Sequence, residues 1–171
     1  LGTAEGLLMG TRSGNVDPLV VINLMEKIGD AQKVSDIIHK KSGLLGVSGV
    51  SSDLRDVEEA AEKGCERSKI AQDILITGVK KYIASYAAEM GGVDVVVFTA
   101  GIGENGITFR EAVCKDMEFM GIKFDAEKNN CRGKEVVIST PDSKVTVMVV
   151  PTDEEMAIAR DTKRCVEEAG K

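Results

Sequence analysis

Glycines and polar residues directly follow an apolar segment near the middle of the chain. The apolar segment, residues 93–99, is short and rich in β-branched side chains, which predicts a strand covered on both faces. A strand that ends in a glycine turn and enters a helix points several backbone N–H groups at one spot, where the helix dipole favours negative charge. The turn residues are Gly101, Ile102, Gly103, Glu104 and Asn105. They predict either a phosphate site or a tight turn without a ligand, and the spacing excludes a Rossmann dinucleotide site.

Arg12 lies between glycines, in the run Met9-Gly10-Thr11-Arg12-Ser13-Gly14. Flanking glycines allow a close-packed loop, from which a guanidinium can hold phosphoryl oxygens through two parallel hydrogen bonds. The alternative is an ordinary solvated arginine on a loop.

The segment Asp53-Leu54-Arg55-Asp56 carries a similar ambiguity. Its charges suit a polar ligand. They equally suit a helix start in which Asp53 is the N-cap and Arg55 pairs with a neighbouring carboxylate.

The acidic run Thr152-Asp153-Glu154-Glu155 follows the last apolar segment of the chain. Thr152 and Glu155 match the S/T-x-x-E capping box, which assigns Glu155 to the backbone. Glu154 is then available, and a carboxylate just beyond a buried strand suits a magnesium ligand or a water-mediated partner.

Helices are expected in five regions that could position these residues. Asp17-Pro18 predicts a helix start, and that helix runs to about residue 27. A second helix covers about residues 31–41 with Gly43 as its C-cap, and residues 44–53 suit a tight connection more than a helix. The longest helix is predicted over residues 66–90, stopped by Gly91-Gly92. Another spans about 108–120 with Thr108 and Glu111 as a possible capping box, and the last begins after Thr152.

Apolar positions within the 66–90 segment support the helix predicted there. The residues that recur at helical spacing are Ile70, Ile74, Val79, Ile83 and Ala87. Two further strands are expected at residues 136–139 and 145–150, joined by a turn at Pro141-Asp142. Strands that alternate with helices predict an α/β fold with a small mixed sheet.

Composition limits the remaining classes of function. The 171 residues carry a net charge of −6, which argues against a broad nucleic-acid-binding face, and no apolar run is long enough for a membrane helix. Neither a signal peptide nor a disulfide pattern is seen, so we expect a cytoplasmic protein with free thiols. The only histidine, His39, cannot anchor a catalytic triad without partners.

Taken together and in order, the motifs resemble the acetate kinase family, the acetokinase branch of the sugar kinase, Hsp70 and actin superfamily. The matching segments cover essentially the whole chain and are GLLMGTRSG at 6–14, DP at 17–18, SGLLGVSG at 42–49, SDLRD at 52–56, FTAGIGEN at 98–105 and PTDEE at 151–155. The resemblance implies one partial domain over residues 1–171, an incomplete C-terminal ribonuclease-H-like domain. It also implies reversible phosphoryl transfer between ATP and a short-chain carboxylate such as acetate, with magnesium.

The resemblance also implies roles for individual residues. Arg12 corresponds to an arginine that stabilises charge on the transferring phosphoryl group, and Glu154 to a glutamate associated with magnesium. The nucleotide-site residues that it implies are Asp53, Leu54, Arg55, Gly101, Ile102, Gly103, Glu104 and Asn105.

Family members are much longer, and this chain lacks the N-terminal domain with its carboxylate-binding and catalytic residues and the phosphate loop of the second domain. We therefore expect the chain alone to be inactive, since this chemistry depends on groups placed from several directions. Family members are homodimers, so self-association is expected. The alternatives are a fragment of a propionate or butyrate kinase, or a non-catalytic nucleotide-binding module.

Overall fold

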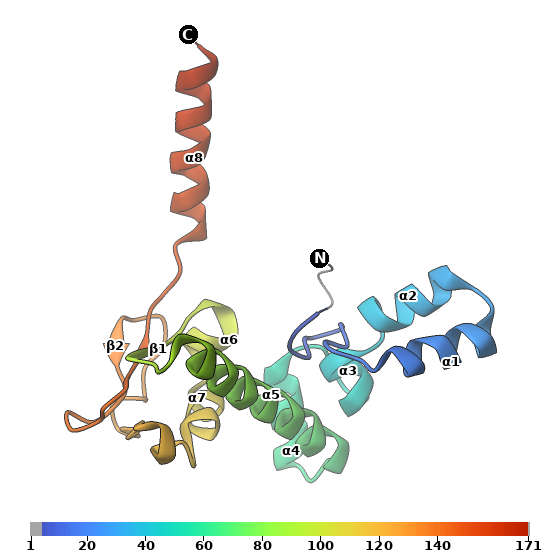
Figure 1. The fold of residues 1–171 in the computed structure, drawn as a ribbon, viewed down its shortest axis with the longest axis horizontal. Helices are drawn as coiled ribbons and strands as arrows, with labels where there is room; N and C mark the ends of the chain where they lie inside the picture. Colours follow the sequence, from blue (N-terminus) through green and yellow to red (C-terminus); the bar gives the residue numbers. More distant parts are fainter. Residues whose placement is uncertain (1–4, 171) are drawn as a thin grey trace. The chain divides into compact units, whose positions relative to one another are not determined.

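The computed structural model describes residues 5–170, and its contacts divide the chain into two compact units, Leu1–Gly92 and Val93–Lys171 (Figure 1). Among the described residues the first unit contains helices and loops, whereas the second contains a small mixed sheet and further helices. The predicted α/β class is therefore confirmed. That residues 1–171 form one partial domain stays a prediction.

The first unit is built on its longest helix. Helices α3 and α4 both pack against α5, and α1 packs against α2 as a hairpin. Leu44, Val57, Ala71 and Leu75 are buried between these helices and form the core. The helices are α1 (Pro18–Ile28), α2 (Ala31–Lys40), α3 (Gly43–Ser48), α4 (Leu54–Glu62) and α5 (Glu66–Met90).

Several helix ends in this unit lie where the sequence predicts them. The Asp17 carboxylate accepts a hydrogen bond from the Leu19 N–H at 2.8 Å, and Pro18 occupies the first turn. At the other end of α1, Gly29 adopts a left-handed φ of 67°. Gly91 ends α5 in the same way, with φ of 73°.

Two predictions on the segment after α2 are wrong. Lys41, not Gly43, is the C-cap of α2, and its N–H donates to the Ile37 carbonyl. Residues 43–48 form the short helix α3 instead of an irregular connection. The small side chains mark close packing: a Cβ at Gly43 would lie 2.1 Å from the Met9 carbonyl oxygen.

The apolar residues that recur along α5 are not all buried. Ile70 and Ile74 are 51% and 44% exposed, whereas Ser68, Ala71 and Leu75 face the core. Small residues are buried here because α3 and α4 approach α5 closely. Two of the larger apolar side chains are left at the surface, whereas Ala87 of the same set is buried.

The sheet of the second unit has the strand order β1-β3-β2. β1 (Val95–Phe98) pairs with β3 (Thr146–Val149) in parallel, with Phe98 opposite Val149. β2 (Val136–Val137) pairs with β3 antiparallel, and the predicted turn at Pro141-Asp142 joins them. Phe98, Phe109 and Val147 are among the buried side chains of this unit.

Two predictions on the second unit need correction. β1 is not covered on both faces, because Val95 and Val97 are 46% and 48% exposed. The helix expected over residues 108–120 is shorter, and the capping box of Thr108 and Glu111 is absent because Gly106 is the N-cap without a side-chain bond. The helices of this unit are α6 (Ala100–Asn105), α7 (Ile107–Cys114), the 3₁₀ turn η1 (Glu118–Met120) and α8 (Glu154–Ala169).

Helix α8 starts after residue 152 as predicted, and all its described residues are exposed. Ile158 and Val166 are each about two-thirds exposed. Within residues 5–170, no helix is both long and apolar enough to cross a membrane. The four cysteines are free thiols, as expected.

Candidate functional site

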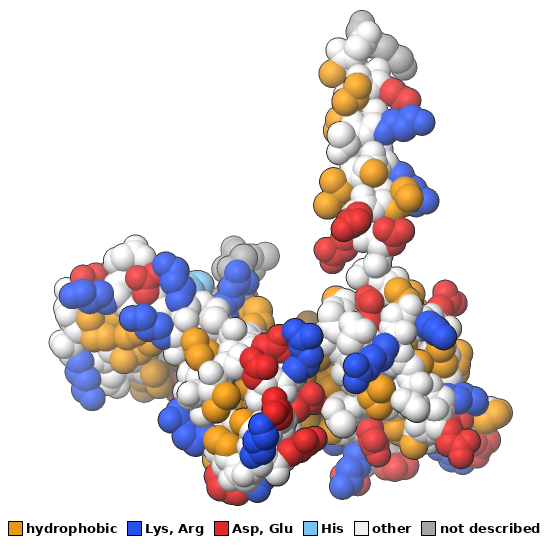
Figure 2. Space-filling model, turned by 180° about the vertical axis from the view of Figure 1, so that it is seen from behind, with side chains coloured by type: hydrophobic (Ala, Val, Ile, Leu, Met, Phe, Trp, Pro, Cys, Tyr) orange, Lys and Arg blue, Asp and Glu red, His pale blue; other side chains and the backbone are white. Residues whose placement is uncertain are grey.

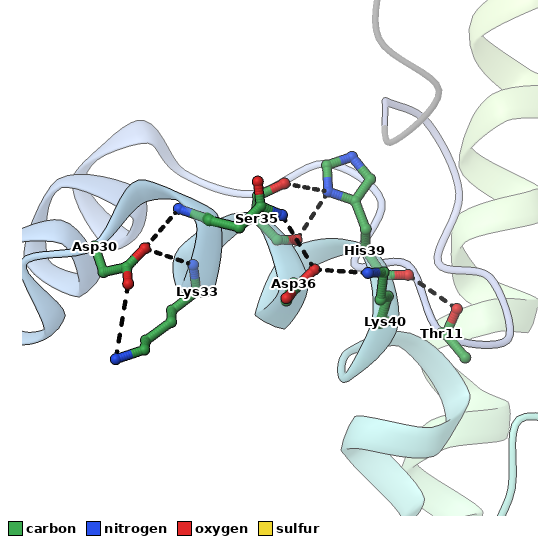
Figure 3. Close-up of polar contacts among 8 residues, drawn as sticks. Thr11, Asp30, Lys33, Ser35, Asp36, His39 and Lys40 are labelled. Carbon is green, nitrogen blue, oxygen red and sulfur yellow. Dashed lines mark hydrogen bonds and ion pairs between the residues drawn. The ribbon is translucent and has the colours of Figure 1, made fainter.

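The loop that carries Arg12, residues 9–14, is fixed to α2 by two hydrogen bonds. The Ser13 N–H donates to the Ile38 carbonyl at 3.0 Å, and the Thr11 hydroxyl donates to the His39 carbonyl at 2.9 Å. Figure 3 shows the second contact at the end of α2, where the His39 ring is itself held by the Ser35 carbonyl, 2.9 Å from Nδ1. His39 thus serves the structure of the loop through its backbone.

The same loop is also fixed to the start of α3. The Leu44 N–H donates to the Met9 carbonyl at 2.8 Å, and the Leu45 N–H donates to the Gly10 carbonyl at 3.0 Å. These are first-turn N–H groups of α3, which have no partner within their own helix. The loop carbonyls satisfy them, so the loop and α3 stabilise each other.

Glycines allow this loop to pack closely. A Cβ at Gly14 would lie 2.6 Å from backbone atoms of Leu7 and Leu8, and one at Gly10 would lie 2.8 Å from the Ser52 carbonyl oxygen. The second contact places the loop beside the residues that precede α4. The Arg12 side chain is exposed on this braced loop. Such a loop holds a guanidinium in place at low entropic cost, which suits electrostatic stabilisation of a phosphoryl group.

The residues that begin α4 are paired with each other. The Asp53 carboxylate caps the helix by accepting the Arg55 N–H at 2.9 Å, and it also accepts the Arg55 guanidinium at 3.0 and 2.6 Å. The Arg55 side chain lowers the pKa of Asp53 to about 2, and Asp53 raises the pKa of Arg55. Leu54 is buried, so its side chain belongs to the core. The geometry therefore matches the helix start that the sequence predicts. It is also compatible with a polar ligand, because the outer face of Arg55 remains exposed.

In the second unit, residues 101–105 form helix α6 instead of the tight turn that the sequence predicts. Ala100, at the junction with β1, has a φ of 57°, a left-handed conformation that costs a non-glycine residue of order 1 kcal/mol or more. The left-handed conformation of Ala100 turns the chain sharply, so that α6 begins directly at the end of the strand. The Asn105 amide donates to the Gly101 carbonyl at 3.0 Å.

The two glycines of α6 have different surroundings. A Cβ at Gly103 would lie 3.1 Å from the carbonyl carbon of Phe98, so packing against β1 explains that glycine. Around Gly101, apart from its two chain neighbours and the backbone of α6 itself, no atom of the described residues lies within 4 Å of the corresponding position. The backbone at Gly101 is therefore open to close approach by a ligand.

Glu104 connects α6 to the segment before α8. Its carboxylate accepts the Thr152 N–H at 2.7 Å and the Thr152 hydroxyl at 3.0 Å. These bonds, the backbone N–H first, lower the pKa of Glu104. The connection brings the predicted nucleotide segment to within two residues of Glu154 along the chain.

This contact shows that the predicted capping box of Thr152 and Glu155 is wrong. The Asp153 carboxylate caps α8 by accepting the Met156 N–H at 3.0 Å. The argument that singled out Glu154 by assigning Glu155 to the backbone therefore fails. The role of Glu154 now rests on the family resemblance.

Glu154 is the first residue of α8, and it is exposed. Among residues 5–170, no group of three or more acidic, histidine or cysteine side chains could hold a metal ion. A single carboxylate still fits Mg²⁺, which proteins commonly hold through one or two carboxylates together with substrate phosphates and water.

Arg110 is a buried residue that the sequence analysis missed. It is fully buried, and its guanidinium donates to the carbonyls of Gly103, Glu104, Asn129 and Cys131 and to the Asn129 side chain, at 2.8 to 2.9 Å. Two of these carbonyls lie at the C-terminal end of α6, where a cation is favoured by the helix dipole. Burial lowers the pKa of Arg110. Arg110 therefore fixes the end of α6, and a basic residue directly beside Phe109 in an apolar helix was the signal for it.

The predicted residues therefore fall into two groups. Arg12 and the start of α4 lie in the first unit, whereas α6 and Glu154 lie in the second. In the first unit, the close approach of Gly10 to Ser52 brings the Arg12 loop beside the start of α4. In the second unit, the hydrogen bond from the Thr152 N–H to Glu104 connects α6 to the segment before α8. Each group is supported by backbone hydrogen bonds, and the side chains of Arg12 and Glu154 are both exposed.

Comparisons with known proteins identify the family of this chain. The sequence model of the acetokinase family matches residues 1–160. An acetate kinase of Porphyromonas gingivalis is 62% identical over 160 residues, which cover 92% of this chain and 40% of that protein. The chain thus spans about two-fifths of the length of the curated relatives that it matches.

Solved structures give the same result. The crystal structure of Porphyromonas gingivalis acetate kinase superimposes with a TM-score of 0.90 at 60% identity, covering 95% of this chain and 41% of that one. A propionate kinase of Francisella tularensis superimposes with a TM-score of 0.83 at 36% identity, covering 91% and 40%.

Proposed function

The chain belongs to the acetokinase family, and we propose that it is the C-terminal, nucleotide-binding part of an acetate kinase. The reaction is reversible transfer of a phosphoryl group between ATP and acetate, giving acetyl phosphate and ADP. The observation that carries the proposal is the Arg12 loop, in which backbone bonds to two helices support one exposed guanidinium.

Arg12 has the role of stabilising charge on the transferring phosphoryl group. This chemistry has little covalent work for the protein to do, so catalysis depends on position and charge. A planar guanidinium offers two parallel donors to phosphoryl oxygens. Because the loop is already ordered by α2 and α3, little entropy is lost when the arginine engages its ligand.

The backbone of α6 is the proposed nucleotide contact. The first-turn N–H groups of α6 have no backbone carbonyl partner within the helix. The Glu104 carboxylate engages the Ala100 N–H, and the open position at Gly101 lets a ligand approach the others. Arg110 holds the opposite end of α6, and Glu104 holds its side to Thr152. Asp53 and Arg55 contribute a second polar surface in the first unit.

Glu154 is the residue that would hold Mg²⁺, directly or through water. When bound, the ion would neutralise part of the phosphate charge. The exposed Glu154 carboxylate at the start of α8 would supply one negative ligand, and phosphates and water would supply the others.

The experiment that tests Arg12 uses the longer enzyme that contains this chain. Arg12→Ala is expected to lower kcat for acetyl phosphate formation by about three orders of magnitude, as loss of a phosphoryl-stabilising arginine does in other enzymes. Lys33→Ala is the matched control, because Lys33 is an exposed cation of the same unit that is paired with Asp30 at 3.7 Å. An unchanged kcat in the arginine variant would remove Arg12 from the mechanism.

The chain alone is proposed to be inactive. With Mg-ATP and acetate it should form no acetyl phosphate above background, and turnover at the rate of a complete enzyme would contradict this. Mg-ADP binding without turnover fits both this proposal and the alternative of a non-catalytic nucleotide-binding module, so the activity of the longer enzyme decides between the two.

Propionate kinase is the second candidate for the parent activity, favoured by the structural match to the Francisella tularensis enzyme. Steady-state kinetics with acetate, propionate and butyrate distinguish the two. The preferred substrate is the one with the highest kcat/KM in the longer enzyme.

Self-association as a homodimer is also part of the proposal. Helix α1 packs one face on α2, but its Leu19, Ile22 and Met25 side chains form an exposed apolar stripe at helical spacing. Figure 2 shows hydrophobic side chains gathered on this hairpin between lysines. Sedimentation that gives a monomer at high concentration would contradict the homodimer.

A further inference from the structure

Arg67, in the first turn of α5, is bonded to the C-terminal end of α3. Its Nε donates to the Val47 carbonyl and its Nη2 donates to the Gly46 carbonyl, both at 2.8 Å. These carbonyls belong to the last turn of α3, where C=O groups have no partner within the helix and the helix dipole favours a cation. A guanidinium presents its donors in a fixed plane, so the two bonds together fix both the position and the orientation of that turn.

The glycine that ends α3 leaves room for this arginine. Gly49 is the C-cap of α3, with a left-handed φ of 71°, and its N–H donates to the Leu45 carbonyl at 2.8 Å. A Cβ at Gly49 would lie 3.2 Å from Nη1 of Arg67. The guanidinium therefore packs directly on the backbone at the end of α3, in addition to its two hydrogen bonds.

Helix α3 needs support from outside, because it contains only six residues. Helices shorter than about 12 residues are marginal by themselves in water. The N–H groups of Ser42, Leu44 and Leu45, at its start, donate to carbonyls of the Arg12 loop at 2.8 to 3.0 Å. The accepting carbonyls belong to residues 9–11, which directly precede Arg12. Helix α3 therefore connects α5, at one end, to the Arg12 loop at the other.

The base of the Arg12 loop is fixed independently of α3. The Asn15 side chain accepts the Gly6 N–H and donates to the Tyr82 hydroxyl of α5, both at 2.8 Å. Leu44 of α3 is also buried in the core, where packing keeps the helix against α5. Loss of the Arg67 side chain therefore leaves the loop attached and α3 packed. What it removes is the restraint on the last turn of α3, and with it the precision with which the loop is held.

We propose that Arg67 is a positioning residue for Arg12, which it holds in place through α3 and the loop carbonyls. The inference rests on the function proposed above for Arg12. A misplacement of about 1 Å can cost about a hundredfold in rate, even when it arises far from the reacting atoms. Contacts made mainly in the transition state affect kcat, whereas contacts made equally in the ground state affect KM. Substitution of Arg67 should therefore lower kcat with little change in KM.

The first experiment measures kcat and KM for Mg-ATP in the longer enzyme that contains this chain. Arg67→Met keeps a long side chain without donors, and we expect kcat to fall about tenfold while KM changes less than about twofold. Arg67→Lys keeps a cation without the planar fork, so it should recover part of the loss. Lys69→Met is the matched control, because Lys69 is an exposed cation in the same turn that pairs with Glu66 at 2.7 Å. An unchanged kcat in Arg67→Met, or a loss confined to KM, would overturn the inference.

A double-mutant cycle separates positioning of Arg12 from a general loss of structure. Once Arg12→Ala has removed the guanidinium, adding Arg67→Met should lower kcat by less than about twofold, because nothing is left to position. A further tenfold fall in the double variant would show that Arg67 acts independently of Arg12, and would overturn the inference. An unchanged kcat in Arg12→Ala alone would instead refute the role proposed for Arg12, and the inference with it. The two failures are therefore detected in different variants.

Hydrogen exchange on the chain itself supplies a readout that does not depend on activity. The amides of Leu44 and Leu45, which bond to the loop carbonyls, should exchange about tenfold faster in Arg67→Met than in wild type. The amide of Leu75, in the middle of α5, should be unchanged, which verifies that the unit stays folded. If Arg67→Met loses the fold, Arg67→Lys serves for the same comparison, with a smaller acceleration expected. Unchanged exchange at the two α3 amides in the folded variant would overturn the inference.

Discussion

The Arg12 loop and helix α6 both contain closely spaced glycines, but these glycines have different structural roles. In the loop, and at Gly43 beside it, a Cβ would collide with backbone atoms at 2.1 to 2.8 Å. In α6, Gly103 is explained by packing on β1, whereas Gly101 has nothing near it. The glycines of the first region allow the backbone to pack closely, whereas Gly101 in the second leaves space that the described residues do not fill. The contrast distinguishes glycines that the fold requires from a glycine that a ligand would require.

The largest expected effect comes from Gly43→Ala, which would break the scaffold of the Arg12 loop. The new methyl group would lie 2.1 Å from the Met9 carbonyl oxygen at a φ of +66°. We expect a loss of about 4 kcal/mol or more in the free energy of unfolding, measured by urea denaturation. Gly29→Ala is the matched control, with a φ of +67° and open space, and should cost about 1 kcal/mol. Equal losses would show that conformation, not contact, requires glycine at residue 43.

Loss of the buried guanidinium should be nearly as damaging to the second unit. Arg110→Met leaves the carbonyls of Gly103, Glu104, Asn129 and Cys131 without their donor. We expect a cost of about 3 kcal/mol in the free energy of unfolding and looser protection of α6 in hydrogen exchange. Arg132→Met, at an exposed arginine nearby in the sequence, should change the stability by less than about 0.5 kcal/mol. A stable Arg110→Met chain with unchanged exchange would show that α6 does not need the arginine.

The smallest expected effect concerns the ion pair at the start of α4. Asp53 has a folded-state pKa of about 2, below its ordinary value, so its stabilising contribution is present above pH 4 and is lost as the pH falls through 2. Asp53→Asn keeps a good N-cap and removes only the charge. The stability difference between wild type and this variant should therefore shrink as the pH falls from 7 to 2. The pair is exposed, so solvent screening keeps that difference small.

Local signals in the sequence predicted most of the helices and strands. Asp17-Pro18, Asp53 and Gly91-Gly92 mark helix ends through short-range chemistry, and the structure places them there. The buried face of α5 was not predicted, because it depends on which helices approach from far along the chain. The exposed face of β1 was missed for the same reason.

In the candidate site, too, local features were predicted from the sequence and contacts between distant residues were not. The sequence named Glu104 as a nucleotide-site residue, but its bond to Thr152 joins residues that are 48 positions apart. Because Thr152 bonds to Glu104, it does not form the predicted capping box with Glu155. The local argument for Glu154 fails with that capping box. Arg110 was missed because two of its partner carbonyls, those of Asn129 and Cys131, lie about 20 residues along the chain, and the basic residue beside Phe109 does not by itself indicate them.

The central claim is that the open backbone at Gly101 serves the nucleotide. Calorimetric titration of the chain and of its Gly101→Ala variant with Mg-ADP tests this claim most directly. The added methyl meets no described atom, so the variant should be as stable as wild type or gain about 0.5 kcal/mol from better helix propensity. We predict that it nevertheless binds Mg-ADP at least tenfold more weakly. Wild-type affinity in the stable variant would contradict the claim.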